Sequence, residues 1–337
     1  MKKILFLALL IGLSSCDDGD LQIEEVDFEA ANIESCPGLA DPTQTTFFFK
    51  IDEDEALLLN LAGGLINNET SEPGTLASTI PEPSNLIYRF FSDNVTSAYF
   101  CDAIPPLEPS VVKENLATAG NIIVDTKVDT LTAETKDYRH TISITDLSLN
   151  NDQGEQLTDL STLVYGDFIT KPKNSAKLEV PFSNYADIVP TACTTAPIDG
   201  TIRLYKVFND EFIALDVATL DTMFINKATD TIPRILDLKD KEVFKYVVFD
   251  TVADNDLACA ASYAENIKSW RFVSTAGNLK VETVASVPDA NGSITYTHNI
   301  TLENMVLTSK ANGTATTGVS LAAIPSVAFG THTTVQQ

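Results

Sequence analysis

Short runs of alternating apolar and polar residues follow one another along most of this 337-residue chain. The apolar positions are rich in aromatic and β-branched residues, and hydrophilic turns such as Asn150-Asn151-Asp152-Gln153-Gly154 separate the runs. This pattern is typical of β-strands. It predicts strands over residues 46–51, 86–91, 122–124, 140–149, 201–208, 243–249, 270–273 and 299–307.

The chain contains two copies of one domain. Cys36 and Cys101 are 65 residues apart, and Cys193 and Cys259 are 66 apart. Further landmarks recur around them: Tyr138-Arg139-His140 with Tyr296-Thr297-His298, Lys50 and Asp54-Glu55 with Lys206 and Asp210-Glu211, Leu86–Phe91 with Phe244–Phe249, Glu114-Asn115-Leu116 with Glu265-Asn266-Ile267, and Tyr165-Gly166 with Phe329-Gly330. Landmarks in the same order at nearly constant spacing indicate an internal duplication.

One short helix is expected in each copy, after its second cysteine. In the first copy, Ser110 can cap a helix over Val111–Ala119, and Gly120 can end it. About seven short strands in roughly 150 residues otherwise predict a mainly β chain of two tandem antiparallel, Ig-like β-sandwich domains, with a barrel as the alternative. Copy 1 is expected over residues 21–170, a hydrophilic linker over 171–176 and copy 2 over 177–337.

The first 20 residues predict export and a lipid anchor. Lys2 and Lys3 precede a ten-residue apolar run, which is too short to span a bilayer, and Leu13-Ser14-Ser15-Cys16 follows it. Residues 1–15 therefore read as a signal peptide, with Cys16 as the acylated first residue of an acidic tether over 16–20. The alternatives are a plain signal peptide with a chance cysteine, or a buried N-terminal helix.

Charge and cysteine content narrow the classes of function. The formal charge is −25, and loss of Lys2 and Lys3 makes it −27, so the surface repels nucleic-acid phosphate. Four cysteines remain after Cys16, and an exported protein with an even number favours disulfides. If each copy folds alone, Cys36 pairs with Cys101 and Cys193 with Cys259; a bridge between domains is the alternative.

The chain resembles lipoproteins of unknown function from flavobacteria, within the Bacteroidetes. The resemblance lies in Ser15-Cys16-Asp17-Asp18-Gly19-Asp20, in Val26-Asp27-Phe28, and in Tyr99-Phe100-Cys101 with Ile104-Pro105-Pro106, so it covers the tether and copy 1 best. It implies an acyl chain such as palmitate on Cys16 and a place on the outer face of the outer membrane. It implies no activity and no functional residue.

Both repeated histidines have a structural interpretation. Tyr138, His140, Ile142 and Ile144 share one parity, so on a strand they point to one apolar face, where a hydrogen-bonded histidine is more common than a ligand or base. His298 occupies the equivalent position in copy 2, and His332 carries little signal.

Two acidic segments are weak calcium candidates, because calcium takes several oxygen ligands from loops. They are Asp52-Glu53-Asp54-Glu55 and the segment containing Asp250, Asp254 and Asp256, which is the preferred one. Neither has EF-hand spacing, so solvated turns are the simpler interpretation and no cofactor is expected. Four Asp-Thr-apolar triplets resemble O-glycosylation acceptors of exported Bacteroidetes proteins, at Thr130, Thr222, Thr231 and Thr251.

No GxSxG elbow, HExxH helix, phosphate loop or dinucleotide fingerprint occurs in the chain. The only tryptophan, Trp270, lies in an apparent core strand, which weakens glycan stacking as a function. The sequence therefore favours a lipid-anchored, surface-exposed envelope protein that acts as a non-catalytic binding or structural module. Its expected partner is an envelope protein or a polysaccharide, and a surface hydrolase acting on glycans is the alternative.

Overall fold

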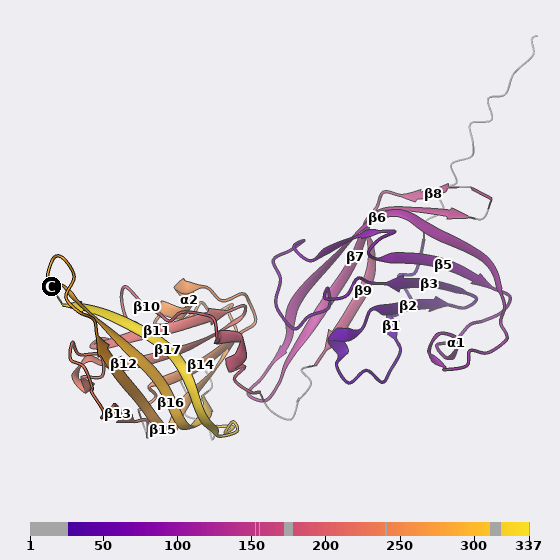
Figure 1. Cartoon of the computed structure of the whole chain (residues 1–337). Helices are drawn as coiled ribbons and strands as arrows, with labels where there is room; N and C mark the ends of the chain where they lie inside the picture. Colours follow the sequence, from indigo (N-terminus) through magenta and orange to yellow (C-terminus); the bar gives the residue numbers. More distant parts are fainter. Residues whose placement is uncertain are drawn as a thin grey trace, which may run out of the picture.

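The computed structural model describes residues 26–336, except 152, 155, 172–177, 240 and 311–317. These residues form two antiparallel sheets, which lie end to end in Figure 1 and fall within the two expected copies. The predicted mainly β fold of two tandem sandwich domains is confirmed. The signal peptide, Cys16, the tether and all of the linker except Lys171 lie outside the described residues.

The first sheet has nine strands. They are β1 (Glu34–Ser35), β2 (Phe47–Asp52), β3 (Glu55–Asn60), β4 (Ala77–Ile80), β5 (Asn85–Phe91), β6 (Val111–Leu131), β7 (Lys136–Asn151), β8 (Gln156–Asp159) and β9 (Leu163–Thr170), with the short helices η1 (Pro42–Gln44) and α1 (Ala98–Cys101) between them.

The second sheet has eight strands. They are β10 (Thr191–Ala192), β11 (Thr201–Phe208), β12 (Glu211–Ala218), β13 (Arg234–Asp237), β14 (Phe244–Phe249), β15 (Ser269–Ala285), β16 (Ile294–Lys310) and β17 (Ile324–Gln336), with η2 (Phe182–Tyr185), η3 (Thr219–Asp221) and α2 (Asn255–Cys259).

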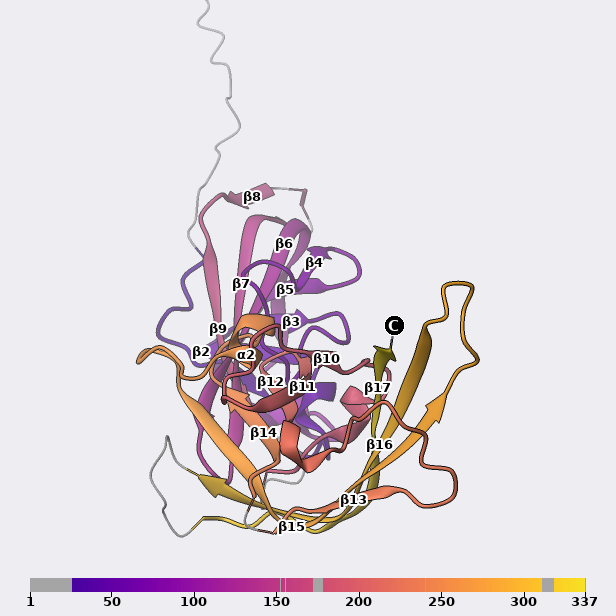
Figure 2. The same cartoon turned by 90° about the vertical axis from the view of Figure 1, so that its left-hand side faces the viewer.

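Each sheet makes two layers because its two longest strands bend and take part in both. In copy 1, β6 pairs with β5 through Val111–Leu116 and with β4 through Gly120–Ile123. In copy 2, β15 pairs with β14 and then with β13 in the same way, and Figure 2 shows β15 and β16 curving around the shorter strands. The main core of each copy fills the space between these layers, around Phe48 and Ile142 in copy 1 and around Leu215 and Phe272 in copy 2.

A glycine-containing bulge marks the bend in each copy. The β15–β16 pairing shifts register between Ser274 and Asn278, where Gly277 has a φ of +107°. A Cβ on Gly277 would lie 2.7 Å from the carbonyl oxygen of Glu303, so only glycine fits without movement of the backbone. Gly120 marks the equivalent bend of β6.

The strand order agrees with the duplication inferred from the landmarks. The paths β1-β2-β3-β5-β6-β7 and β10-β11-β12-β14-β15-β16 are equivalent, β4 and β13 pair with the long strand of their copy, and β9 and β17 pair with the next strand. Only β8 has no counterpart among the described residues. Two copies of one topology therefore make up the described chain.

The predicted position of the helix is wrong. Val111–Ala119 belongs to strand β6, and each short α-helix ends on the second cysteine of its copy instead of following it. Residues 115, 117, 120, 122, 124 and 126 are buried in turn along β6, with one extra residue at the bulge. This period of two continues the strand through the proposed helix, so packing against both neighbours overrode the local capping signal.

Candidate functional site

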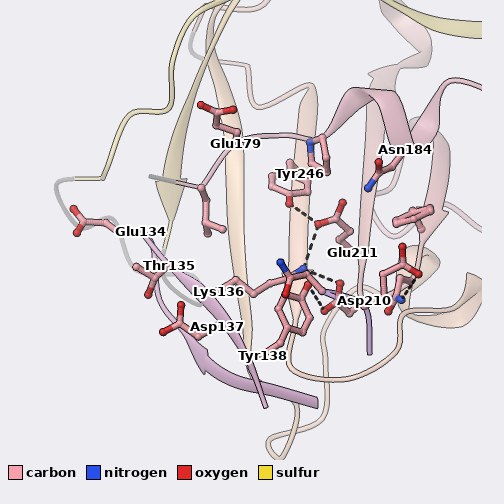
Figure 3. A pocket seen from close by; sticks show the side chains of 16 residues that line it. Glu134, Thr135, Lys136, Asp137, Tyr138, Glu179, Asn184, Asp210, Glu211 and Tyr246 are labelled. Carbon is pink, nitrogen blue, oxygen red and sulfur yellow. Dashed lines mark hydrogen bonds and ion pairs between the residues drawn. The ribbon is translucent and has the colours of Figure 1, made fainter. Parts of the chain in front are cut away.

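The two copies meet at a pocket of about 400 Å³, which we call the interdomain pocket. Copy 1 contributes the start of β7, the turn before it and two residues before β4. Copy 2 contributes η2, its preceding segment, the β11–β12 turn and Tyr246 of β14 (Figure 3). Its lining residues are Asn68, Glu69, Glu134, Thr135, Lys136, Asp137, Tyr138, Leu178, Glu179, Pro181, Asn184, Phe208, Asn209, Asp210, Glu211 and Tyr246. A pocket of this size between domains is a common place for a ligand.

One wall of the pocket is a buried ion cluster that joins the two copies. Nζ of Lys136, from β7 of copy 1, lies 2.7 Å from Oδ1 of Asp210 and 3.3 Å from Oε2 of Glu211, both in copy 2. All three side chains are almost completely buried. We call Lys136, Asp210 and Glu211 the interdomain ion cluster.

Three tyrosine hydroxyls complete the cluster. Tyr138 donates to Oδ2 of Asp210 at 3.2 Å. Tyr185 donates to Oε1 of Glu211 at 3.1 Å, and Tyr246 to its Oε2 at 2.6 Å. Each of the four carboxylate oxygens therefore contacts a protein donor, as buried carboxylates require if they are to remain charged.

Burial and the neighbouring charges shift the pKa values of these groups in opposite directions. Burial raises the pKa of Asp210 and of Glu211, although Lys136 acts to lower both. For Lys136, burial acts to lower the pKa, but Glu211, Tyr138 and Asp210 together raise it above its ordinary value. The ammonium is therefore held charged by two carboxylates that compete for it.

Neutral contacts between the copies add to the junction that the ion cluster forms. Asn209, in the β11–β12 turn, hydrogen-bonds the hydroxyl of Thr70 and donates to its carbonyl oxygen at 3.2 Å. Trp270 donates from Nε1 to the carbonyl oxygen of Leu131 at 3.3 Å, and Leu131 packs against the core of copy 2. The tryptophan that sequence analysis placed in a core strand thus lies at the junction between copies.

The two repeated histidines are buried and are not among the residues that line the pocket, in agreement with their structural interpretation. In copy 1, His140 hydrogen-bonds Thr126 at 2.8 Å and Thr170 at 2.9 Å, and Thr170 donates to Asn68. Burial lowers the pKa of His140 to about 4.

The same chain of hydrogen bonds through four side chains recurs in copy 2. His298 hydrogen-bonds Thr283 at 2.8 Å and Thr334 at 2.9 Å, and Thr334 donates to Asn226. Burial, with a smaller effect of His332, lowers the pKa of His298 to about 4. His332 itself packs beside His298, with ring centroids 5.9 Å apart.

The four cysteines pair within the copies, as the duplication predicts. Cys36 and Cys101 form one disulfide, and Cys193 and Cys259 form the other. A bridge between domains, which was the alternative, is not formed. Each disulfide lies beside a second, smaller core on the face of the short strands that points away from the main core.

The calcium candidates are not brought together. The Oδ1 atom of Asp250 accepts from the backbone N–H of Lys268, and Asp254 caps α2 by accepting from the backbone N–H of Leu257. Asp256 lies within that helix. In the described part of the chain, no three His, Cys, Asp or Glu side chains form a group that could hold a metal ion.

The four glycosylation candidates lie apart on the surface. Thr222, Thr231 and Thr251 are exposed, and Thr130 is half-buried near the end of β6. Cys16 lies outside the described residues.

Sequence analysis missed the interdomain ion cluster. Asp210-Glu211 was noticed only as the repeat of Asp54-Glu55, and Lys136 was not noticed at all. The repeat itself held a signal, because Ile294 stands at the start of β16 where copy 1 has Lys136 at the start of β7. A cation present in one copy only is a reasonable candidate for a contact between copies.

Within the described residues, no helix combines the length and apolar character needed to cross a membrane. No protein-family model, no curated protein and no solved structure matches this chain.

Proposed function

We propose that this protein is a lipid-anchored envelope protein, attached to the outer membrane through Cys16 and facing the cell exterior. In this proposal its two domains form one rigid, non-catalytic unit that binds another envelope protein or a polysaccharide. The signal-like N-terminus and the resemblance to flavobacterial lipoproteins support the location. No cofactor is part of the proposal.

The observation that carries the binding or structural role is the interdomain ion cluster. Removing one partner of a buried ion pair typically costs about 3–5 kcal/mol, because the remaining charge is left without compensation. Lys136 of one copy and two carboxylates of the other therefore favour one fixed arrangement of the domains. A fixed arrangement suits a protein that presents a surface.

The same cluster argues against a glycan hydrolase at this site. A glycosidase needs one carboxyl group that protonates the leaving oxygen and a second that acts on the sugar or on water. All oxygens of Asp210 and Glu211 instead contact Lys136 or tyrosine hydroxyls. Asp210 and Glu211 are therefore poorly placed to act as such a catalytic pair.

The rigid arrangement can be tested with Lys136→Met. This change leaves Asp210 and Glu211 buried without their cation, so we expect the two copies to separate while each sheet stays folded. Small-angle X-ray scattering should show a larger radius of gyration, and circular dichroism should show unchanged β content. Lys127→Met, at an exposed position of β6, is the matched control. An unchanged scattering profile for Lys136→Met would show that the interdomain ion cluster does not fix the arrangement of the domains, and the proposal would lose the observation that carries it.

The anchor can be tested with Cys16→Ala. We expect this variant to leave the membrane fraction and appear in the soluble fraction, because the acylation site is gone. Protease treatment of intact cells should degrade the wild-type protein if it faces the exterior. Membrane association of Cys16→Ala that still requires detergent for release would contradict the lipoprotein assignment.

A further inference from the structure

The interdomain pocket has a second wall with an excess of negative charge. Glu134, Asp137 and Glu179 line it, and we call these three residues the acidic wall. Figure 3 shows Glu134, Asp137 and Glu179 on the opposite side of the pocket from Asp210 and Glu211. Lys136 is the one lysine or arginine among the described lining residues, and the interdomain ion cluster already engages it.

Asp137 in the acidic wall has an unused acceptor. It is only 7% exposed, and its Oδ1 atom is buried without a hydrogen-bond partner among the described residues. Its other oxygen, Oδ2, lies 3.8 Å from Nζ of Lys171, whose side chain is 69% exposed. That distance is too long for a hydrogen bond. A buried carboxylate oxygen without a donor is unfavourable, so this position favours a donor supplied from outside the chain.

The remaining lining residues indicate what kind of ligand would carry this donor. Leu178, Pro181 and Phe208 give the pocket an apolar surface beside the carboxylates. An ammonium group on an aliphatic stem satisfies both, because the stem packs on apolar groups while the charged end donates. A bare metal ion does not fit, since no group of three metal-ligating side chains exists in the part of the chain that the structure describes.

We infer that the interdomain pocket binds a primary aliphatic ammonium group, with Asp137 as its principal acceptor and Glu134 and Glu179 as further counter-charges. This inference rests on the proposed role as a binding module and names the chemistry of its ligand. The ammonium can belong to a free aliphatic amine or to a lysine side chain, since both present the same group on the same kind of stem.

The test uses the full mature chain carrying Cys16→Ala and isothermal titration calorimetry at pH 7. Cadaverine represents a free amine, and Nα-acetyl-lysine-methylamide represents a lysine side chain. 1-Pentanol is the neutral control, and calcium chloride tests for a metal. We expect saturable binding of at least one ammonium compound, and none of pentanol or calcium. Asp137→Asn should weaken that binding about tenfold or more, because a charge-assisted hydrogen bond is lost.

A control variant distinguishes binding in the pocket from general attraction of the amine to the negatively charged surface. Asp93→Asn, at an exposed position outside the lining, should bind the amine as the parent does. If Asp137→Asn fails to fold by circular dichroism, the double variant Glu134→Gln/Glu179→Gln takes its place, with an expected loss of about threefold or more.

Two results would overturn the inference. One is the absence of saturable binding of either ammonium compound, and the other is equal binding by the parent and the pocket variants. The scattering result for Lys136→Met does not depend on any ligand, so it shows separately whether the interdomain ion cluster holds the two domains together.

Discussion

At the scale of single residues, the two buried histidines show how closely the copies correspond. Thr170 donates to Oδ1 of Asn68 at 2.6 Å, so it accepts from Nε2–H of His140, and Thr126 donates to Nδ1. The same order runs from Thr283 through His298 and Thr334 to Asn226. Each histidine is therefore held as the neutral Nε2–H tautomer by two hydroxyls, which suits a core position.

His140 should make the folded protein less stable as the pH falls. Its pKa is about 4 in the folded protein, because of burial, and 6.5 in an ordinary environment. The unfolded chain therefore takes up a proton below pH 6.5 that the folded protein does not take up until about pH 4. This contribution is complete above pH 6.5 and is lost as the pH falls towards 4, by on the order of 3 kcal/mol.

His140→Gln tests this dependence, since glutamine does not titrate. The free energy of unfolding, from urea denaturation, should be lower in the variant at pH 7. The difference from the wild type should shrink by about 2–3 kcal/mol at pH 4.5. A difference that stays constant between these pH values would show that His140 does not resist protonation. Taking the difference cancels the other acids that titrate in the same range.

The residue scale also shows what a sequence can and cannot predict. The parity of Tyr138, His140, Ile142 and Ile144 was enough to place the histidine in the core, because a strand has a fixed period of two. Lys136 lies two residues before Tyr138 on the same strand, yet its partners are more than 70 positions away. No local pattern reports such a contact.

At the scale of elements, β6 is the instructive case. Ser110 and Gly120 look like the two ends of a helix, but Gly120 lies at a bulge in a 21-residue strand. A glycine that ends a helix and one that allows a bulge are indistinguishable by identity alone. The strands over 201–208 and 243–249 were predicted closely because they are short and rich in β-branched and aromatic residues, a composition that favours strands.

Gly277→Ala should destabilise copy 2 by about 2–4 kcal/mol, because it combines an unfavourable positive φ with a clash against the Glu303 carbonyl. Gly292→Ala is the matched control, with a φ of +81° and no atom within 4 Å of the new Cβ. We expect only about 1 kcal/mol there. Thermal unfolding of both variants measures the two costs, and equal costs would show that the bulge tolerates a side chain.

At the scale of the whole molecule, the duplication was predictable and the junction was not. Ordered landmarks reveal a repeat without any knowledge of the fold. The two equivalent acid pairs, however, have different surroundings. Glu55 in copy 1 accepts from Tyr88 at 2.5 Å and is half-buried, whereas its counterpart Glu211 is covered by copy 1 and contacts Lys136. Equivalent acid pairs thus acquire different roles from what lies against them.

Replacing each of these glutamates by glutamine compares the two environments directly. Glu211→Gln should lower the free energy of unfolding by about 1–3 kcal/mol and increase the radius of gyration, because Lys136 loses a charged partner. Glu55→Gln should cost about 1 kcal/mol or less and leave the radius of gyration unchanged. Urea denaturation and scattering measure both quantities. Equal behaviour of the two variants would mean that the interdomain ion cluster adds nothing to the junction.

The two disulfides have a mechanical consequence. Cys36 and Cys101 are 65 residues apart and enclose β2 to β5, and Cys193 and Cys259 are 66 apart and enclose β11 to β14. When the chain is pulled by its ends, force passes across each bridge and bypasses the enclosed strands. At roughly 3.5 Å per residue, the loop closed by each disulfide would extend by about 230 Å if the bridge were absent. Under load, only the strands outside the bridged loops can unravel, which are β1, β10 and those after the second cysteine of each copy. Reducing agents would therefore convert a short, stiff link into a much longer one.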